Sequence, residues 1–233
     1  MKTNSYIKKI KRENKPIVFL MIGGPGSGKS NIKKKVLEKF NYNISNFVDL
    51  DPDETLKDLY NNNLNKFDKS KKVYDKLLKH FIENNNNLII DKVGSNYNKI
   101  NDLINKFKKK YKIYLIIVYT DLDIALDRIK KRSKKTGRSI RSRPGKNWPY
   151  SDYKKLPSSV RKYLNYSCNK VNNIFIYDNN KDSIIIFESE CIRKKNKKTK
   201  KTIKTCKINK KSKRFEKTYK IKSLKKYCDK III

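Results

Sequence analysis

One glycine-rich segment of the chain has the residues needed to bind phosphate, and it reads Gly23-Gly24-Pro25-Gly26-Ser27-Gly28-Lys29-Ser30. It matches G-x-x-x-x-G-K-[ST], in which the backbone N–H groups of a tight turn point at phosphate oxygens. Lys29 would reach the β- and γ-phosphates, and the Ser30 hydroxyl would bind Mg²⁺. Four of the seven glycines in the chain lie in this segment. The sequence therefore predicts a site for ATP or GTP.

Two acidic positions follow apolar runs and could complete this chemistry. Asp51-Pro52-Asp53-Glu54 comes after the run 46–50, where an acceptor hydroxyl would sit, so an acid there could take the acceptor's proton. Asp91 follows Leu88-Ile89-Ile90 and could hold Mg²⁺ directly or through water. A capping or solvated aspartate is the alternative interpretation of Asp91.

Arginines are concentrated in one stretch of a chain that otherwise uses lysine. The sequence has 51 Lys and 9 Arg, and five of those arginines are Arg128, Arg132, Arg138, Arg141 and Arg143. The planar guanidinium grips phosphate through two hydrogen bonds, which an ammonium does not do. Arg128 and Arg132 are four residues apart and share one face of a helix. This stretch predicts a lid over the phosphates, and a solvated basic loop is the alternative.

The elements that position these residues alternate between strands and helices. Apolar runs at 17–22, 46–50, 88–90, 113–119 and 174–177 predict strands, and helical spacing appears at 29–40, 73–82, 122–133 and 158–171. Such alternation indicates a mostly parallel five-stranded sheet with helices on both faces. Ligands bind such sheets at the carboxyl ends of the strands, where the glycines and acids fall. Residues 184–187 would add an antiparallel edge strand.

A phosphate cradle alone does not identify a reaction. Asp91-Lys92-Val93-Gly94 fits the D-x-x-G of a GTPase, but Asn180-Lys181-Asp182-Ser183 has Ser where a guanine-reading N-K-x-D needs Asp. A GTPase is therefore disfavoured. A small P-loop kinase needs an acceptor site, an acid and an arginine lid, and the chain has candidates for each.

The order of these segments resembles the zeta-toxin family of P-loop kinases. The likeness covers about residues 16–190: the cradle, Asp51-Pro52-Asp53-Glu54, Asn87-Leu88-Ile89-Ile90-Asp91, Ala125-Leu126-Asp127-Arg128 with the Arg loop, and Tyr177-Asp178-Asn179. After the third strand those kinases typically carry Glu, then Gly and Thr, to hold a sugar. This chain instead has Asp91-Lys92-Val93-Gly94.

The resemblance implies an activity and roles for individual residues. The best-studied members use ATP and Mg²⁺ to phosphorylate the sugar of UDP-N-acetylglucosamine. Asp51 would be the acid that activates the acceptor hydroxyl, and Asp53 would help to position the acceptor. Arg128 with Arg138 or Arg141 would neutralise the transferring phosphoryl group, and Arg132 would bind the nucleotide. The acceptor would be a small molecule.

The formal net charge of +38 suggests a second hypothesis. An NTP-binding protein associated with nucleic acid, or a polynucleotide kinase, would use this basic surface. The Lys excess also fits a bias toward A- and T-rich codons. Residues 193–233 have 19 Lys or Arg and two acids. We therefore expect a basic segment at 1–15, a kinase domain at 16–190, and a weakly ordered Lys-rich tail at 191–233 that could bind nucleic acid non-specifically.

Cysteine spacing and hydropathy indicate the kind of compartment in which the protein is expected. Its four cysteines form no Cys-x-x-Cys pair, which argues against a zinc site or a disulfide framework. No apolar stretch reaches the length of a membrane span. We therefore expect an intracellular, reducing compartment and no membrane partner.

Overall fold

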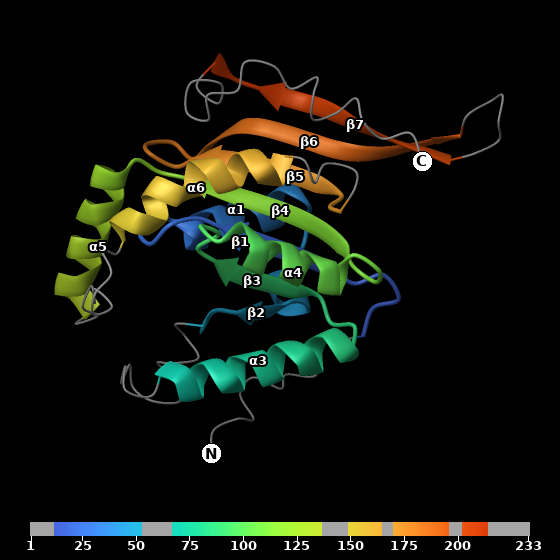
Figure 1. Cartoon of the computed structure of the whole chain (residues 1–233), viewed down its shortest axis with the longest axis horizontal. Helices are drawn as coiled ribbons and strands as arrows, with labels where there is room; N and C mark the ends of the chain where they lie inside the picture. Colours follow the sequence, from blue (N-terminus) through green and yellow to red (C-terminus); the bar gives the residue numbers. More distant parts are fainter. Residues whose placement is uncertain (1–11, 53–66, 137–148, 165–169, 196–201, 214–233) are drawn as a thin grey trace.

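The computed structural model describes residues 12–52, 67–136, 149–164, 170–195 and 202–213. They form a seven-stranded sheet in the order β2-β3-β1-β4-β5-β6-β7 (Figure 1). The first five strands are parallel, as the sequence predicts. They are β2 (Val48–Leu50), β3 (Leu88–Lys92), β1 (Ile17–Ile22), β4 (Lys112–Tyr119) and β5 (Asn173–Asp178).

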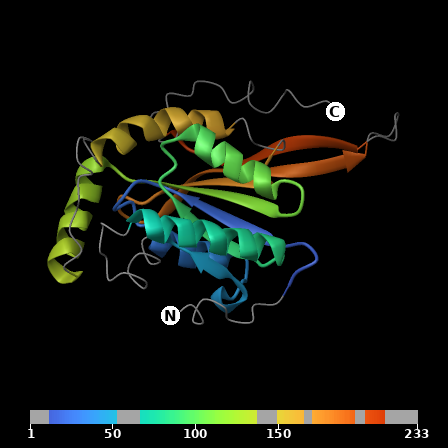
Figure 2. The ribbon, with the colours of Figure 1, turned by 60° about the horizontal axis from the view of Figure 1, so that its bottom comes forward.

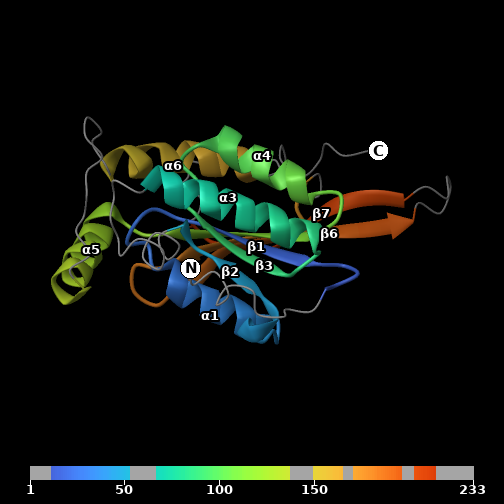
Figure 3. The same ribbon diagram turned by 90° about the horizontal axis from the view of Figure 1, so that it is seen from below.

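Helices cover both faces of the sheet, which is why its central strands are apolar throughout. Side chains of β1 alternate between two buried cores, with Leu20 in one and Phe19 in the other. The first core lies under α3 (Phe67–Glu83), α4 (Tyr97–Phe107) and α6 (Tyr150–Tyr163), and the second lies under α1 (Lys29–Lys39). Figure 3 shows the three helices and α1 on opposite sides of the strands.

Two helices differ from the sequence prediction. The helix expected at 158–171 is α6, which begins at Tyr150 and ends at Tyr163. Pro157 lies inside it, and a proline normally marks a helix start because it lacks an N–H and clashes with the preceding turn. The amphipathic helix α4 was not predicted at all. The segment between α5 (Leu122–Thr136) and α6 was expected to be a loop, and residues 137–148 of it lie outside the described part.

The sheet also continues past the expected domain boundary at 190. β6 (Ile184–Lys195) pairs antiparallel with β5, and β7 (Thr202–Lys211) pairs antiparallel with β6. Residues 191–195 and 202–211, which the sequence analysis places in the tail, are paired strands of the sheet. Backbone hydrogen bonds between strands do not depend on apolar side chains, so a lysine-rich segment can pair in this way. The hairpin points away from α5 (Figure 2).

The short element before β2 is a 3-10 helix, η2 (Ile44–Asn46). Within the described ranges, no helix is both long enough and apolar enough to cross a membrane.

Candidate phosphate-binding and phosphoryl-transfer site

The glycine-rich segment links the end of β1 to the start of α1. Gly28 caps α1 at its N-terminus with a φ of +83°, and Gly26 has a φ of +74°. Both angles lie in the left-handed region that glycine adopts without strain. The Gly23 N–H donates to the carbonyl of Lys92 at 3.2 Å, which ties the turn to β3. The backbone therefore forms a tight turn at a helix N-terminus, a geometry that can bind an anion.

Residues from distant elements hold the turn in place. The carbonyl of Ser27 accepts hydrogen bonds from Thr120 Oγ1 at 3.0 Å and from Asn179 Nδ2 at 2.7 Å. A Cβ added to Gly28 would lie 2.1 Å from Asn179 Nδ2, so only glycine fits there. Thr120 was not predicted, because a single threonine after a strand has no distinguishing pattern.

Tyr153 of α6 covers the turn from the other side. Its hydroxyl donates to the carbonyl of Pro25 at 2.8 Å, and a Cβ on Gly24 would lie 2.4 Å from its ring. Burial raises the pKa of the Tyr153 hydroxyl, so the group remains a hydrogen-bond donor. The sequence analysis missed this residue, since it is one of 15 tyrosines and precedes the helix that was predicted.

Lys29 and Ser30 occupy the first turn of α1, as the motif requires. Lys29 is partly buried, and its Nζ donates to the carbonyl of Gly23 at 2.9 Å across the turn. Ser30 is exposed. Both residues therefore lie beside the cradle that the glycines form.

Asp91 lies on β3, the strand next to β1, and is 7% exposed. Burial raises the pKa of this carboxyl, and the charges of Lys33 and Lys29 act in the opposite direction. Lys33 Nζ lies 3.6 Å from Asp91 Oδ2 and 2.7 Å from Asp49 Oδ2. Lys33 was not predicted, although it shares a helix face with Lys29 four residues earlier.

The same carboxylates act on Lys33. Burial alone would lower the pKa of Lys33, but Asp91, Asp49 and Asp51 together leave it raised. Lys33 is therefore a fixed cation that holds one oxygen of Asp91.

The second oxygen of Asp91 is suited to a metal ion. Asp91 Oδ1 is buried and has no hydrogen-bond partner among the residues that the structure describes. A hard cation such as Mg²⁺ prefers oxygen ligands and keeps water and phosphate in its shell. The described residues contain no group of three or more His, Cys, Asp or Glu that could hold a metal. Asp91 and Ser30 fit Mg²⁺ that is shared with phosphate oxygens, because two protein ligands then suffice.

Asp51 lies one residue past β2, close to this group. Leu50 pairs with Ile90 in the parallel register, so Asp51 and Asp91 follow at adjacent strand ends. Asp51 is partly buried, and its charge contributes to the raised pKa of Asp91. The structure thus brings Asp51 and Asp91 together. Asp53, the other acid predicted to contact a ligand, lies outside the described residues.

Arg128 of α5 reaches the cradle. Its Nη2 donates to the carbonyls of Asn179 at 2.8 Å and Asn180 at 3.3 Å, which fixes the guanidinium plane. Its Nη1 is buried and has no partner within the described part of the chain, and a Cβ on Gly28 would lie 3.5 Å from that atom. The unpartnered donor is directed at the turn where phosphate would lie.

The other predicted arginines differ from Arg128. Arg132 is exposed, one helical turn further along α5. Arg138, Arg141 and Arg143 lie outside the described residues, so the lid remains a prediction. The described site combines an anion cradle, a guanidinium, and two carboxylates on adjacent strand ends.

Comparisons with known proteins agree with this geometry. A family model described as Zeta toxin matches residues 3–190. No curated protein sequence matches the chain. A structure of the PezAT chromosomal toxin-antitoxin system of the human pathogen Streptococcus pneumoniae is 19% identical, with a TM-score of 0.62 over 79% of this chain and 75% of that one.

Two further similar structures are chains from the complex of AvrRxo1-ORF1 and AvrRxo1-ORF2. The native complex gives a TM-score of 0.57 at 14% identity, over 88% of this chain and 64% of that one. The complex with ATP gives a TM-score of 0.51 at 15% identity, over 75% and 58%. At these identities the likeness concerns the fold, which is the P-loop kinase fold that the sequence predicts.

Proposed function

Because this chain belongs to the zeta toxin family, we propose that it is a P-loop kinase that transfers the terminal phosphoryl group of ATP to a hydroxyl of a small molecule. The observation that carries the proposal is a pair of buried polar atoms beside the cradle, Asp91 Oδ1 and Arg128 Nη1, which have no partner among the described residues. Buried polar groups normally have partners, so a ligand that satisfies both atoms is expected. Phosphate with a divalent cation does so.

Each residue at the site has a role in this reaction. The cradle and Lys29 bind and orient the phosphates of ATP, and Arg128 places its guanidinium where negative charge develops. Mg²⁺ bound by Ser30 and Asp91 would neutralise charge on the phosphate oxygens. Lys33 fixes the orientation of Asp91 through its other oxygen.

The transfer step needs a base at the acceptor, and Asp51 is our candidate. The acceptor hydroxyl gives its proton to the Asp51 carboxylate while its oxygen bonds to the γ-phosphorus. The bond from the γ-phosphorus to the bridging oxygen breaks, and ADP leaves. Asp53, Arg138 and Arg141 would complete the site, with Asp53 at the acceptor and the arginines closing over the phosphates.

The test is a transfer assay with labelled ATP and Mg²⁺. The acceptor panel contains UDP-N-acetylglucosamine, other nucleotide sugars, nucleosides, nucleotides and oligonucleotide ends. We expect label on at least one small-molecule acceptor, and none with Lys29→Ala, whose folding is checked by circular dichroism. Release of the label only as inorganic phosphate, which is transfer to water, would contradict the proposal. Equal transfer by wild type and Lys29→Ala would also contradict it.

A second candidate function is suggested by the charge of the C-terminal part. Residues 193–233 carry 19 Lys or Arg against two acids, and β6 and β7 attach part of this segment to the sheet. A polynucleotide kinase, or an NTP-binding protein on nucleic acid, would use that charge. Label on oligonucleotide ends, together with duplex DNA binding that weakens steeply with salt, would favour it over the first proposal.

A further inference from the structure

Two of the four cysteines occupy directly opposite positions in the hairpin that β6 and β7 form. Cys191 of β6 pairs with Cys206 of β7 in the antiparallel register, which is continuous from Ser189 to Lys195. Residues that are directly opposite in an antiparallel pair of strands share one face of the sheet. The fold thus brings together two cysteines that residues 192–205 separate in the sequence.

The backbone hydrogen bond of Cys191 shows which kind of pair this is. The Cys191 N–H donates to the carbonyl of Asn172 at 2.7 Å, on the side of β5, whereas the carbonyl of Ile186 accepts from the Ser212 N–H on the side of β7. Cys191 and Cys206 are therefore a non-hydrogen-bonded pair, in which the Cα atoms lie about 4.5 Å apart. A disulfide spans about 4.4–6.8 Å between Cα atoms, so the register suits one.

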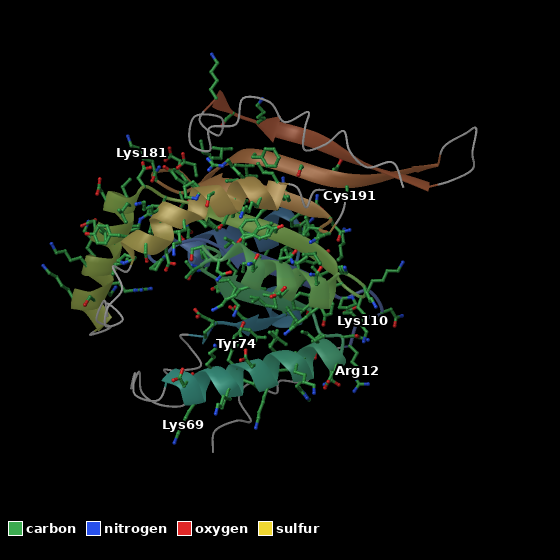
Figure 4. All side chains as sticks on the ribbon, viewed as in Figure 1. Arg12, Lys69, Tyr74, Lys110, Lys181 and Cys191 are labelled. Atoms are coloured by element: carbon green, nitrogen blue, oxygen red, sulfur yellow. The ribbon has the colours of Figure 1, made fainter. Side chains whose placement is uncertain are left out.

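A small reagent can reach Cys191 without opening the core. Phe187, Ser189 and Cys191 alternate onto the same side of β6. The first two are buried, whereas Cys191 is a half-buried thiol. Figure 4 shows Cys191 at the end of the sheet away from α5, and therefore away from the phosphate cradle. A reaction at this thiol is thus separate from the candidate site.

The hairpin is weakly held just beyond the cysteine pair. Arg193 of β6 is directly opposite Lys204 of β7. Like charges at directly opposite positions destabilise an antiparallel pair. Among the described strands, β7 is at the edge of the sheet and pairs with β6 alone. A covalent link between positions 191 and 206 would therefore fasten β7 next to the point where its pairing is least favourable.

We propose that Cys191 and Cys206 are a redox-active pair that reversibly forms a disulfide between β6 and β7. The oxidant is a low-molecular-weight disulfide, RSSR. The thiolate of one cysteine attacks a sulfur of RSSR, the S–S bond of the reagent breaks, and RSH leaves with the proton that the cysteine lost. The thiolate of the second cysteine attacks the resulting mixed disulfide and releases a second RSH. Two protein thiols are thus oxidised to one disulfide, and RSSR is reduced to two RSH.

The experiment compares the oxidised and reduced states of the full-length protein. The folded protein is equilibrated with glutathione disulfide and glutathione, its remaining thiols are alkylated, and disulfide-linked peptides are identified by mass spectrometry. We expect a link between Cys191 and Cys206 that dithiothreitol reverses. Closing a loop of about 15 residues restricts the open chain, so exchange of the β7 amide hydrogens should slow by about 10-fold or more on oxidation. Exchange at residues 23–28 should not change.

Serine substitutions make the test specific to this pair. Cys191→Ser and Cys206→Ser should each abolish the link and the slower exchange, because each removes one of the two sulfurs. The double variant Cys168→Ser, Cys228→Ser is the matched control, and it should form the link and slow the exchange as wild type does. Circular dichroism checks that each variant folds.

The outcomes for wild type decide the proposal without reference to any variant or to the kinase activity. A disulfide to Cys168 or Cys228, a disulfide between two copies of the chain, or only mixed disulfides with glutathione overturns it. A link between Cys191 and Cys206 that leaves the exchange of β7 unchanged also overturns it, because the bond would then not fasten the strand.

Discussion

Three side chains at the site have distinct tasks in the proposed transfer. Arg128 and Asp91 each present a buried atom that has no hydrogen-bond partner among the described residues, and Asp51 follows the strand beside that of Asp91. The groups differ in what they can exchange. A guanidinium keeps its proton at all ordinary pH values, whereas a carboxylate can accept one. Of these three side chains only a carboxylate could act as the base in the proposed transfer, and the arginine would stabilise the developing charge.

Replacing Asp51 by Asn separates binding from proton transfer. Asp51→Asn keeps the size of the side chain but cannot accept the acceptor's proton, so ATP binding should persist. We expect the rate of transfer to fall by about 10²–10⁴-fold, as is typical for loss of a general base. Single-turnover transfer and ATP calorimetry measure the two effects. A normal rate in Asp51→Asn with loss in Asp53→Asn would assign the role to Asp53.

Arg128 and Arg132 provide a matched pair on one helix. Arg128→Lys keeps the charge but loses the fork that two backbone carbonyls orient, so transfer should slow by about 10-fold or more with little change in ATP affinity. Arg132→Lys, at an exposed position one turn on, should retain most of the rate. Comparable losses in both variants would show that charge, rather than the geometry of Arg128, is what matters.

The stability of the protein at alkaline pH should depend on Tyr177, which lies on β5. Burial, and then the carboxylate of Glu188, raises the pKa of Tyr177 to about 12. A group with a raised folded-state pKa contributes stability below its unfolded pKa of about 10, and this contribution disappears as pH rises toward 12. Between pH 8 and 11, wild type should lose about 1 kcal/mol more unfolding free energy than Tyr177→Phe. Tyr150→Phe, at a 48% exposed position, serves as the control in urea titrations.

At the scale of elements, the parallel strands bring Asp51 and Asp91 to one edge of the sheet. The helices α5 and α6 contact the cradle at that edge. β2 and β3 end side by side, so Asp51 and Asp91 meet although 40 residues separate them in the sequence. α5 and α6 lie at the same end of the sheet (Figure 1) and contribute Arg128 and Tyr153. The cradle is therefore fixed by elements that follow it in the chain by about a hundred residues or more.

The contact between α6 and the cradle can be tested at its hydrogen bond. Tyr153→Phe keeps the ring against Gly24 but removes the donor to the Pro25 carbonyl. We expect a loss of about 1 kcal/mol in unfolding free energy and a several-fold weaker affinity for ATP, because the turn becomes less ordered. Urea denaturation and calorimetry measure these effects. The exposed Tyr150→Phe on the same helix should match wild type, and an unaltered Tyr153→Phe would mean that α6 does not order the cradle.

At the scale of the whole molecule, the sheet separates the phosphate-binding cradle from the basic hairpin formed by β6 and β7. The cradle lies at the carboxyl ends of the parallel strands, with α5 and α6. The last part of β6 and the first part of β7 lie at the opposite end (Figures 1 and 2). The hairpin is nonetheless part of the sheet, since the Cys191 N–H donates to the carbonyl of Asn172 at 2.7 Å and the Ser212 N–H donates to the carbonyl of Ile186 at 3.0 Å.

Two truncations test that architecture. A chain ending at Lys213 keeps β7 and should unfold at nearly the wild-type urea concentration, with ATP binding intact. A chain ending at Glu190 loses β7 and part of β6 and leaves the remaining strand edge unpaired, so it should be less stable and aggregate more readily. Light scattering and urea denaturation distinguish them. Equal stability of the two chains would show that the hairpin adds nothing to the fold.

The sequence by itself determined the cradle, the five parallel strands, and the acids at the ends of β2 and β3. These features are local, because a continuous apolar run, a glycine turn and the residue that follows a strand are all read within a few positions. These features lie close together because the carboxyl ends of parallel strands fall at one edge of the sheet, where ligands bind in such folds. The family resemblance rested on the same segments and is confirmed over residues 3–190.

Only the tertiary structure decided which polar residues complete the site. Tyr153 and Pro25 are 128 positions apart, and Thr120 and Ser27 are 93 apart. No local pattern distinguishes such residues, because their roles depend on where other elements bring their partners. The same holds for the register that places Cys191 opposite Cys206 and for the pairing of β7, since strand partners and strand edges are properties of the packed sheet rather than of any one segment.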